Sequence, residues 1–317
     1  MSRDRTEAGY VGFANSAFRG AHRLMQKSSR SSAPPAPSPC LVCNGALGRH
    51  PRLPGLHECS GCGFITADLA LSDSDLRALY GADYFHGDEY ADYVAEGPEL
   101  RENFRRRIDT LLRYQPVEER RRLFEIGAAY GFFLDEVRSS YEQVSGVDIS
   151  EAAAEFARTQ LGVDVVAADY LGQELLEQVD ALCMWDTIEH LSRPRDFIEK
   201  AGRDVRAGGL LALTTGDIDS LNARMRGRRW RMIHPPTHLH YFSRRTLVRL
   251  LDSAGFDVLH LETAGNTRSI RGIVYAILVL RGGKQGLYDK IKTLPGLGQS
   301  VTLDLRDIVY IIARRRS

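Results

Sequence analysis

The stretch Arg121-Arg-Leu-Phe-Glu-Ile-Gly-Ala-Ala-Tyr-Gly-Phe-Phe-Leu-Asp-Glu-Val137 decides the fold of this chain. Residues 123–126 form a short apolar run, which indicates a strand buried on both faces. Residues 132–137 carry apolar side chains at helical spacing. Gly127 and Gly131 lie between the two runs, where glycine lets a strand turn sharply into a helix while its backbone approaches a ligand. The stretch therefore predicts a nucleotide-type cofactor site at the first crossover of an α/β sheet.

The spacing of the small residues separates two classes of cofactor site. A dinucleotide fingerprint has the form G-x-G-x-x-G/A, and here its last small position falls on Phe132. The pattern Glu125-x-Gly127-x-Ala129-x-Gly131 instead resembles motif I of class I S-adenosylmethionine (SAM) methyltransferases, E/D-x-G-x-G-x-G, with alanine replacing the middle glycine. A glycine turn in another kind of α/β protein is the alternative interpretation.

Two more predicted strands end in acidic residues. Residues 143–150 include Asp148, about 20 residues after the glycine turn, where α/β cofactor domains place an acid that binds ribose hydroxyls. Residues 163–169 end at Asp169, which the resemblance implies as the contact to adenine. The same resemblance implies that Ile149 contacts the cofactor. For each acid alone, a helix cap or a solvated loop carboxylate is the alternative.

A fourth predicted strand, residues 179–186, leads into the segment Trp185-Asp-Thr-Ile-Glu-His-Leu191. Its pattern W-D-x-x-E-H-L resembles the segment that follows the fourth strand in the same family. The turn and strand at residues 206–215 resemble the family's fifth strand. Ligands of open α/β sheets bind outside the carboxyl ends of the strands. The resemblance therefore implies that Trp185 and Asp186 contact the cofactor.

Transfer of a methyl group to an oxygen requires a group that accepts the departing proton. His190 is the first candidate because it follows the fourth strand directly. His238 is the second, and it belongs to a His-Leu-x-x-Phe-Ser segment that also resembles the family. A histidine that only holds structural hydrogen bonds is the alternative for both.

Four cysteines before the sheet give the strongest local signal. Cys40-Leu-Val-Cys43 and Cys59-Ser-Gly-Cys62 form two C-x2-C pairs with 15 residues between them, which is a zinc-ribbon spacing. Four thiolates complete a tetrahedron, so the predicted Zn2+ is structural. Two disulfides are the alternative and fit poorly with a cytoplasmic chain. Residues 40–93 resemble the N-terminal module of a bacterial methyltransferase group of type 23, which is often found with sugar, surface-polysaccharide or natural-product biosynthesis.

The 317 residues, 43% of them hydrophobic, are enough for one large domain or two smaller ones. A net charge of +1 gives no overall attraction to nucleic acid or anionic membrane. We find no membrane-length apolar run and no secretory signal, and expect a cytoplasmic protein. Three parts are expected: a flexible basic tail at 1–39, a zinc-ribbon module and connector at 40–97, and a methyltransferase domain at 98–317 with a Rossmann-like, seven-stranded α/β sheet. A weak membrane-surface or partner helix is the alternative for the tail.

The insertion at residues 216–242 is expected to contact the substrate. Its arginines suit a phosphate-bearing acceptor, and a solvated basic loop is the alternative. A metal site of His234, His238 and His240 is a further interpretation, against which we note that no acid or cysteine completes it. The arginines are Arg224, Arg226, Arg228, Arg229 and Arg231.

Two further segments are predicted to cover the cofactor region. Residues 99–114 form an amphipathic helix, whose bases Arg105, Arg106 and Arg107 are expected on a solvated face. The insertion at residues 265–303 contains a short apolar helix that is a lid, a dimer contact or a shallow membrane contact.

These observations predict a SAM-dependent methyltransferase acting on a small molecule: a sugar, a nucleotide sugar or another saccharide-type intermediate, with oxygen slightly favoured over carbon. An RNA methyltransferase that docks RNA through the zinc ribbon is the second interpretation. The neutral charge and the lack of an Asn/Asp-Pro-Pro-Tyr/Phe motif after strand four argue against it. A catalytically inactive scaffold is the third, and the retained cofactor motif argues against that. The oligomeric state is not predicted.

Overall fold

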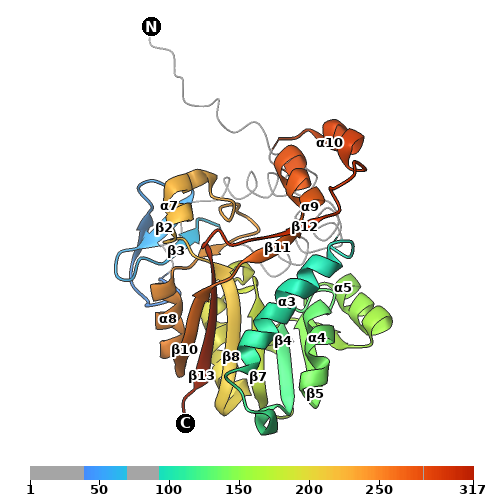
Figure 1. Cartoon of the computed structure of the whole chain (residues 1–317). Helices are drawn as coiled ribbons and strands as arrows, with labels where there is room; N and C mark the ends of the chain where they lie inside the picture. Colours follow the sequence, from blue (N-terminus) through green and yellow to red (C-terminus); the bar gives the residue numbers. More distant parts are fainter. Residues whose placement is uncertain (1–38, 70–92, 281) are drawn as a thin grey trace.

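The computed structural model describes residues 39–69, 93–280 and 282–317, and its centre is a seven-stranded mixed sheet between two layers of helices (Figure 1). The predicted basic tail, except for its last residue, lies outside the described residues. In spatial order the strands are β10 (Phe256–Thr263), β13 (Ile308–Arg315), β8 (Val205–Gly216), β7 (Val179–Trp185), β4 (Arg122–Ile126), β5 (Gln143–Asp148) and β6 (Asp164–Ala167).

Strand direction divides this sheet into two parts. Strands β8, β7, β4, β5 and β6 are parallel to one another. Strand β13 runs antiparallel to both β8 and β10. The predicted seven-stranded α/β sheet is confirmed. Strand β13 begins at Ile308, after a turn in which the Asp304 carboxylate accepts a hydrogen bond from the Arg306 amide and Arg306 has a φ of 52°.

Helices cover both faces of the sheet because each face is apolar. Strand β7 is buried at every residue, as the continuous apolar run predicts. Helices α3, α4 and α5 pack with one face, and α6 and α8 pack with the other. Their bounds are α3 (Gly97–Leu112), α4 (Phe132–Val137), α5 (Glu151–Phe156), α6 (Pro194–Asp204) and α8 (Arg244–Ser253). Short 3-10 helices are η2 (Val117–Glu119), η3 (Arg138–Ser140), η5 (Tyr170–Gly172), η6 (Ile188–His190) and η7 (Gly227–Arg229).

Side-chain caps define where two of the helices begin. The Ser150 hydroxyl accepts a hydrogen bond from the Ala153 amide, so α5 starts directly after Ser150. Helix α5 continues as a single π-helical turn, Ala157–Leu161. Ser243 and Thr246 form a capping box that starts α8. The caps fix the lengths of the loops that lead from strand ends into helices.

A small antiparallel sheet carries the cysteines. Its order is β1 (Leu47–Arg49), β2 (Leu56–Cys59), β3 (Ile65–Ala67) and β9 (His240–Tyr241). Strand β9 belongs to the insertion after β8, so the cysteine segment and that insertion share one sheet. The Phe64 and Phe242 rings lie 5.2 Å apart, and the Arg195 guanidinium donates to the Leu41 carbonyl at 2.8 Å. These contacts join the small sheet to the helices of the large one.

The insertion between β10 and β13 forms a hairpin with helices at its tip (Figure 1). Its strands are β11 (Asn266–Ser269) and β12 (Ser300–Leu303), and its helices are α9 (Ile270–Tyr275), the π-helical η8 (Ala276–Leu280) and α10 (Gln285–Ile291). Helix α7 (Leu221–Arg226) lies in the other insertion. In the described ranges, every helix is too short or too polar to cross a bilayer.

Candidate active site

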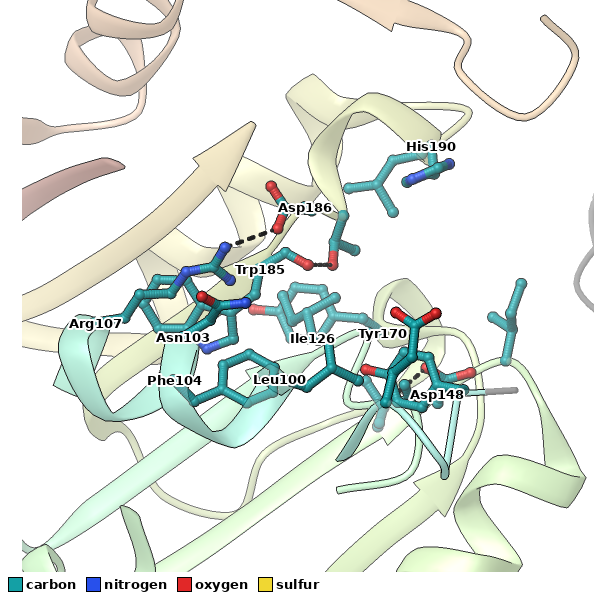
Figure 2. Close-up of a pocket in the computed structure, with 18 of the residues that line it drawn as sticks. Leu100, Asn103, Phe104, Arg107, Ile126, Asp148, Tyr170, Trp185, Asp186 and His190 are labelled. Carbon is teal, nitrogen blue, oxygen red and sulfur yellow. Dashed lines mark hydrogen bonds and ion pairs between the residues drawn. The ribbon is translucent and has the colours of Figure 1, made fainter. Parts of the chain in front are cut away.

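A cavity opens at the carboxyl ends of β4, β5 and β7 (Figure 2). Helix α3 forms one side, η6 another and the β11 segment a third. Of the residues predicted to bind the cofactor, seven line it: Gly127, Ala129, Asp148, Ile149, Asp169, Trp185 and Asp186. Glu125 and Gly131 lie behind this lining and do not contribute to it. His190 lines the cavity as well, whereas His238 does not.

The glycine turn after β4 has a backbone course that few residues tolerate. Gly127 has a φ of 74°, and a Cβ there would lie 2.7 Å from the Thr187 side chain. Ala129 also has a positive φ, 46°, at the position where the motif usually has glycine. Gly131 has a φ of 78°, and a Cβ there would lie 2.7 Å from the Val163 side chain. Gly131 thus allows helix packing, while Gly127 and Ala129 present backbone to the cavity.

Asp148 holds the turn in place from the end of β5. Its carboxylate accepts hydrogen bonds from the Ala129 amide at 2.7 Å and from the Ser150 amide at 2.8 Å. Burial raises the pKa of Asp148, and these backbone hydrogen bonds limit the increase. The carboxylate therefore bridges two strand ends at the cavity wall.

Asp169 combines the two roles that the sequence left open. Its carboxylate accepts a hydrogen bond from the Leu171 amide at 3.0 Å and so caps the 3-10 helix η5. It also lines the cavity. Asp169 therefore both caps η5 and lines the cavity.

Glu125 is a buried acid beneath the turn, with 2% of its surface exposed. Its Oε2 atom has no hydrogen-bond partner within the described part of the chain. Burial and the neighbouring Asp148 charge raise the pKa of Glu125 well above its usual value, and Arg107 opposes this shift. Glu125 is thus protonated more readily than a glutamate in water.

Arg107 corrects the expectation of a solvated arginine face on α3. Its side chain is only 7% exposed, and its Nη2 atom lies 3.0 Å from Asp186 Oδ2 (Figure 2). The guanidinium also lies over the Trp185 ring, 5.4 Å from its centroid. The sequence contains a signal for this position, because Arg107 lies three residues after Phe104 and four before Leu111, on the apolar face of the helix.

Strand β11 contributes a part of the cavity that the sequence did not assign residue by residue. Asn266, Thr267 and Arg268 line the cavity. The Asn103 side chain on α3 donates to the Thr267 carbonyl at 3.1 Å and accepts from the Thr267 amide at 2.7 Å. Of the three interpretations of this insertion, the position of β11 favours a lid.

Three residues form a cluster beside the cavity: Glu189 and His190 on η6, and His238 before β9. One ligand-type atom of each lies within 4.8 Å of the others. Burial and the Asp186 charge raise the pKa of Glu189 to about 8. Burial, followed by the neighbouring His234 and His190, lowers the pKa of His238 well below its usual value. His238 is therefore a neutral, buried imidazole.

The proposed trio of His234, His238 and His240 is not a joint metal site. His240 uses both ring nitrogens elsewhere, with Nε2 2.9 Å from the Leu191 carbonyl and Nδ1 3.0 Å from the Thr66 hydroxyl. It connects η6 to the small sheet. The loop sequence itself has no acid that could complete a metal site. The acid that lies near His238 is Glu189, which belongs to η6.

The arginines of residues 216–242 do not reach the cavity. Arg231 pairs with Asp307, which also accepts a hydrogen bond from the Trp230 indole at 2.8 Å. The other four arginines of the loop are exposed. This arrangement favours the solvated loop over a phosphate site.

The four cysteines of the small sheet converge. All four Sγ atoms lie within 4.8 Å of one another, and the sulfurs are free thiols rather than disulfides. Cys40 and Cys62 sulfurs are 3.6 Å apart, and Cys43 and Cys59 sulfurs are 3.4 Å apart. This geometry fits one tetrahedral metal ion.

The mixed seven-stranded sheet, with its glycine turn and strand-end acids at one cavity, defines a class I SAM-dependent methyltransferase. Residues 99–261, more than half of the chain, match the family Methyltransf_23, described as a methyltransferase domain. The chain belongs to this family and contains a SAM-dependent methyltransferase domain.

Relatives outside this match are distant. The chain is 22% identical over 116 residues to the ubiquinone biosynthesis O-methyltransferase of Hydrogenovibrio crunogenus. That alignment covers 34% of this chain and 48% of the relative, so the chain spans about half the length of the curated protein it matches.

Two solved structures are similar to this chain. One comes from the complex of the Haloferax volcanii Trm112 methyltransferase activator with a protein assigned as a methyltransferase. It has a TM-score of 0.52 and 13% identity, over 78% of this chain and 100% of that one. A Bacillus halodurans protein assigned as a methyltransferase has a TM-score of 0.49 and 16% identity, over 66% of this chain and 99% of that one. The first similarity shows the fold.

Proposed function

We propose that this methyltransferase transfers a methyl group from SAM to an oxygen of a small, saccharide-type acceptor. The observation that carries the proposal is that cofactor-motif residues from three strand ends line the same cavity as Asp186 and His190. Cofactor and acceptor would therefore meet in one enclosed space. The name of the Hydrogenovibrio relative, an O-methyltransferase, agrees with oxygen as the accepting atom.

The cofactor side fits SAM through backbone and carboxylates. Gly127 and Ala129 bring the main chain to the cavity, as close approach of a ligand requires. We assign the ribose hydroxyls to Asp148 and the adenine to Asp169, with Ile149 against its ring. Glu125 and Gly131 shape the turn from behind. When bound, SAM supplies a methyl group on a sulfonium that needs no further activation.

The acceptor side is polar. Asp186, Arg107 and Asn266 line it, which suits a hydroxyl-rich molecule. Arg268 also lines the cavity, so a phosphate group on the acceptor would meet Arg268 rather than the exposed loop arginines.

We assign deprotonation of the acceptor to His190, which lines the cavity, with His238 acting from behind it. In the simplest form of this assignment, His190 itself accepts the proton, which is the general-base role that the sequence predicts.

We also propose that the cysteine cluster binds structural Zn2+. The close approach of Gly45 supports this, because a Cβ there would lie 3.1 Å from Cys59 Sγ and 3.2 Å from Cys43 Sγ. In this organisation residues 40–97 are the ribbon module and its connector, and residues 98–317 are the methyltransferase domain.

Two measurements test the function. Calorimetry should show SAM binding to the wild type, and Asp148→Asn should weaken it about 10-fold to 100-fold, as expected for about 1.5–3 kcal/mol from a charged hydrogen bond. Labelled SAM with nucleotide sugars, lipid-linked sugars and RNA should then label a saccharide. Absence of SAM binding, or labelling of RNA alone, would contradict the proposal.

A further inference from the structure

The cluster of Glu189, His190 and His238 contains a buried carboxylate without partners. Glu189 is 2% exposed, and neither of its carboxylate oxygens makes a hydrogen bond of normal geometry in the ranges that the structure describes. The Thr215 side chain and the Arg107 charge lie near enough to lower its pKa, but burial outweighs them. A buried carboxylate without a counter-charge or hydrogen bonds is costly, and buried acids are normally paired or bound to metal ions. Its oxygen lies within 4.8 Å of a ring nitrogen of each histidine.

The two histidines present nitrogen atoms in the form that binds metals. His190 Nδ1 lies 2.8 Å from the Thr237 carbonyl, and His238 Nδ1 lies 2.9 Å from the Met232 carbonyl. Because a carbonyl only accepts hydrogen bonds, each Nδ1 carries the proton and each Nε2 carries the lone pair. Metal-binding histidines usually have their second nitrogen held in this way.

The position of the cluster connects it to the acceptor. His190 lines the cavity, while Glu189 and His238 lie behind it. Asp186, which lines the cavity three residues earlier, has a buried Oδ1 atom without a hydrogen-bond partner among the described residues, while its Oδ2 pairs with Arg107. Any ion held by the cluster would therefore meet the cavity on its acceptor side.

We propose that Glu189, His190 and His238 bind a divalent metal ion whose remaining coordination positions face the acceptor. Two imidazoles and one carboxylate with open positions suit Zn2+, Mn2+ or Fe2+ better than a fully enclosed structural site. This site is separate from the cysteine cluster, whose four thiolates leave no open position.

The consequence for the reaction rests on the proposed function. A hydroxyl bound to the ion has a lowered pKa, so it releases its proton to water more readily. His190 would then promote deprotonation as a ligand of the ion, in place of a direct general-base role. Acceptors with two neighbouring hydroxyls would bind best, because both oxygens reach one ion.

Titration of Mn2+ into the full-length protein that carries one Zn2+ per chain, which the four thiolates hold, followed by electron paramagnetic resonance, tests the site. Mn2+ prefers nitrogen and oxygen ligands and leaves the thiolates to zinc. We expect one bound Mn2+ per chain. Glu189→Gln and His238→Gln should each weaken binding at least about 10-fold. His260→Gln is the matched control, since this part-buried histidine bonds to Tyr114 outside the cluster.

Thermal unfolding gives a second readout. Mn2+ should raise the Tm of the wild type by mass action but not that of Glu189→Gln. Without Mn2+, Glu189→Gln should be about as stable as the wild type, because the two side chains have nearly the same size and shape and the carboxylate makes no hydrogen bond of normal geometry that is lost. If Glu189→Gln does not fold, the His238→Gln titration decides.

Two results overturn the metal site: a wild type that binds no Mn2+, or cluster variants that bind it as the wild type does. SAM affinity measured on the same samples separates this outcome from the proposed function. A chain that binds SAM but no Mn2+ loses only the metal site. A chain that binds Mn2+ in the expected pattern but no SAM keeps the metal site and loses the proposed function.

Discussion

The two walls of the cavity are built in different ways. The cofactor wall comes from strand ends and the turns directly after them, with Gly127, Asp148 and Asp169 each at the end of its own strand or just after it. The acceptor wall combines α3, η6 and β11, which are far apart in the sequence. A local pattern thus specifies one wall, while tertiary packing assembles the other. Substitutions in the two walls should therefore change different measured quantities.

The largest effect is expected from Gly127→Val in the cofactor wall. A left-handed backbone costs a side-chain-bearing residue about 1–2 kcal/mol, and overpacking against Thr187 adds about 1–3 kcal/mol. We expect SAM binding, measured by calorimetry, to weaken about 100-fold. Gly172→Ala is the control, because a Cβ at Gly172 meets open space. Equal SAM affinities of the two variants would refute the assigned role of the turn.

In the acceptor wall, Arg107→Met should have an intermediate effect. It removes the charged hydrogen bond to Asp186, worth about 1.5–3 kcal/mol, while keeping most of the apolar stem. We expect kcat/KM for the acceptor to fall about 10-fold or more, with a smaller change in SAM affinity. Leu112→Met on the same helix is the control. A change confined to SAM affinity would place Arg107 on the cofactor side instead.

Glu125→Gln should reveal a pH dependence of stability at the boundary between the walls. Burial raises the pKa of Glu125 in the folded state, so the folded chain holds a proton that the unfolded chain releases. The free energy of unfolding of the wild type should therefore fall as pH rises from about 4.5, the range of an ordinary glutamate, through the raised pKa. The Gln variant should lack this contribution. Denaturant unfolding of both proteins without SAM checks it, and parallel pH profiles would contradict it.

The smallest effect is expected outside both walls. Arg228 is exposed and does not line the cavity. Arg228→Ala should change stability by no more than about 0.5 kcal/mol and leave acceptor kinetics unaltered. Arg268→Ala, within the cavity, is the paired variant for a phosphate-bearing acceptor. A raised KM for the acceptor in Arg228→Ala would show instead that the loop contributes to acceptor binding.

Sequence reasoning succeeded where the structure depends on neighbouring residues. The strand before Gly127 and the four converging cysteines are local patterns, and the structure places them as predicted. It failed for Arg107, because a run of arginines suggests a solvated face unless each position is compared with the apolar spacing of the helix. It also missed the proximity of Glu189 to His238, because only the folded chain brings η6 and the later loop together.

The pairing of β3 with β9 has a consequence during synthesis. Thr66 and His240, which bond across these strands, are separated by 174 positions. At about 5–20 residues per second, the ribosome needs on the order of ten to thirty seconds between the two. The edge of β3 cannot pair with β9 until that time has passed, so the nascent chain completes this sheet late.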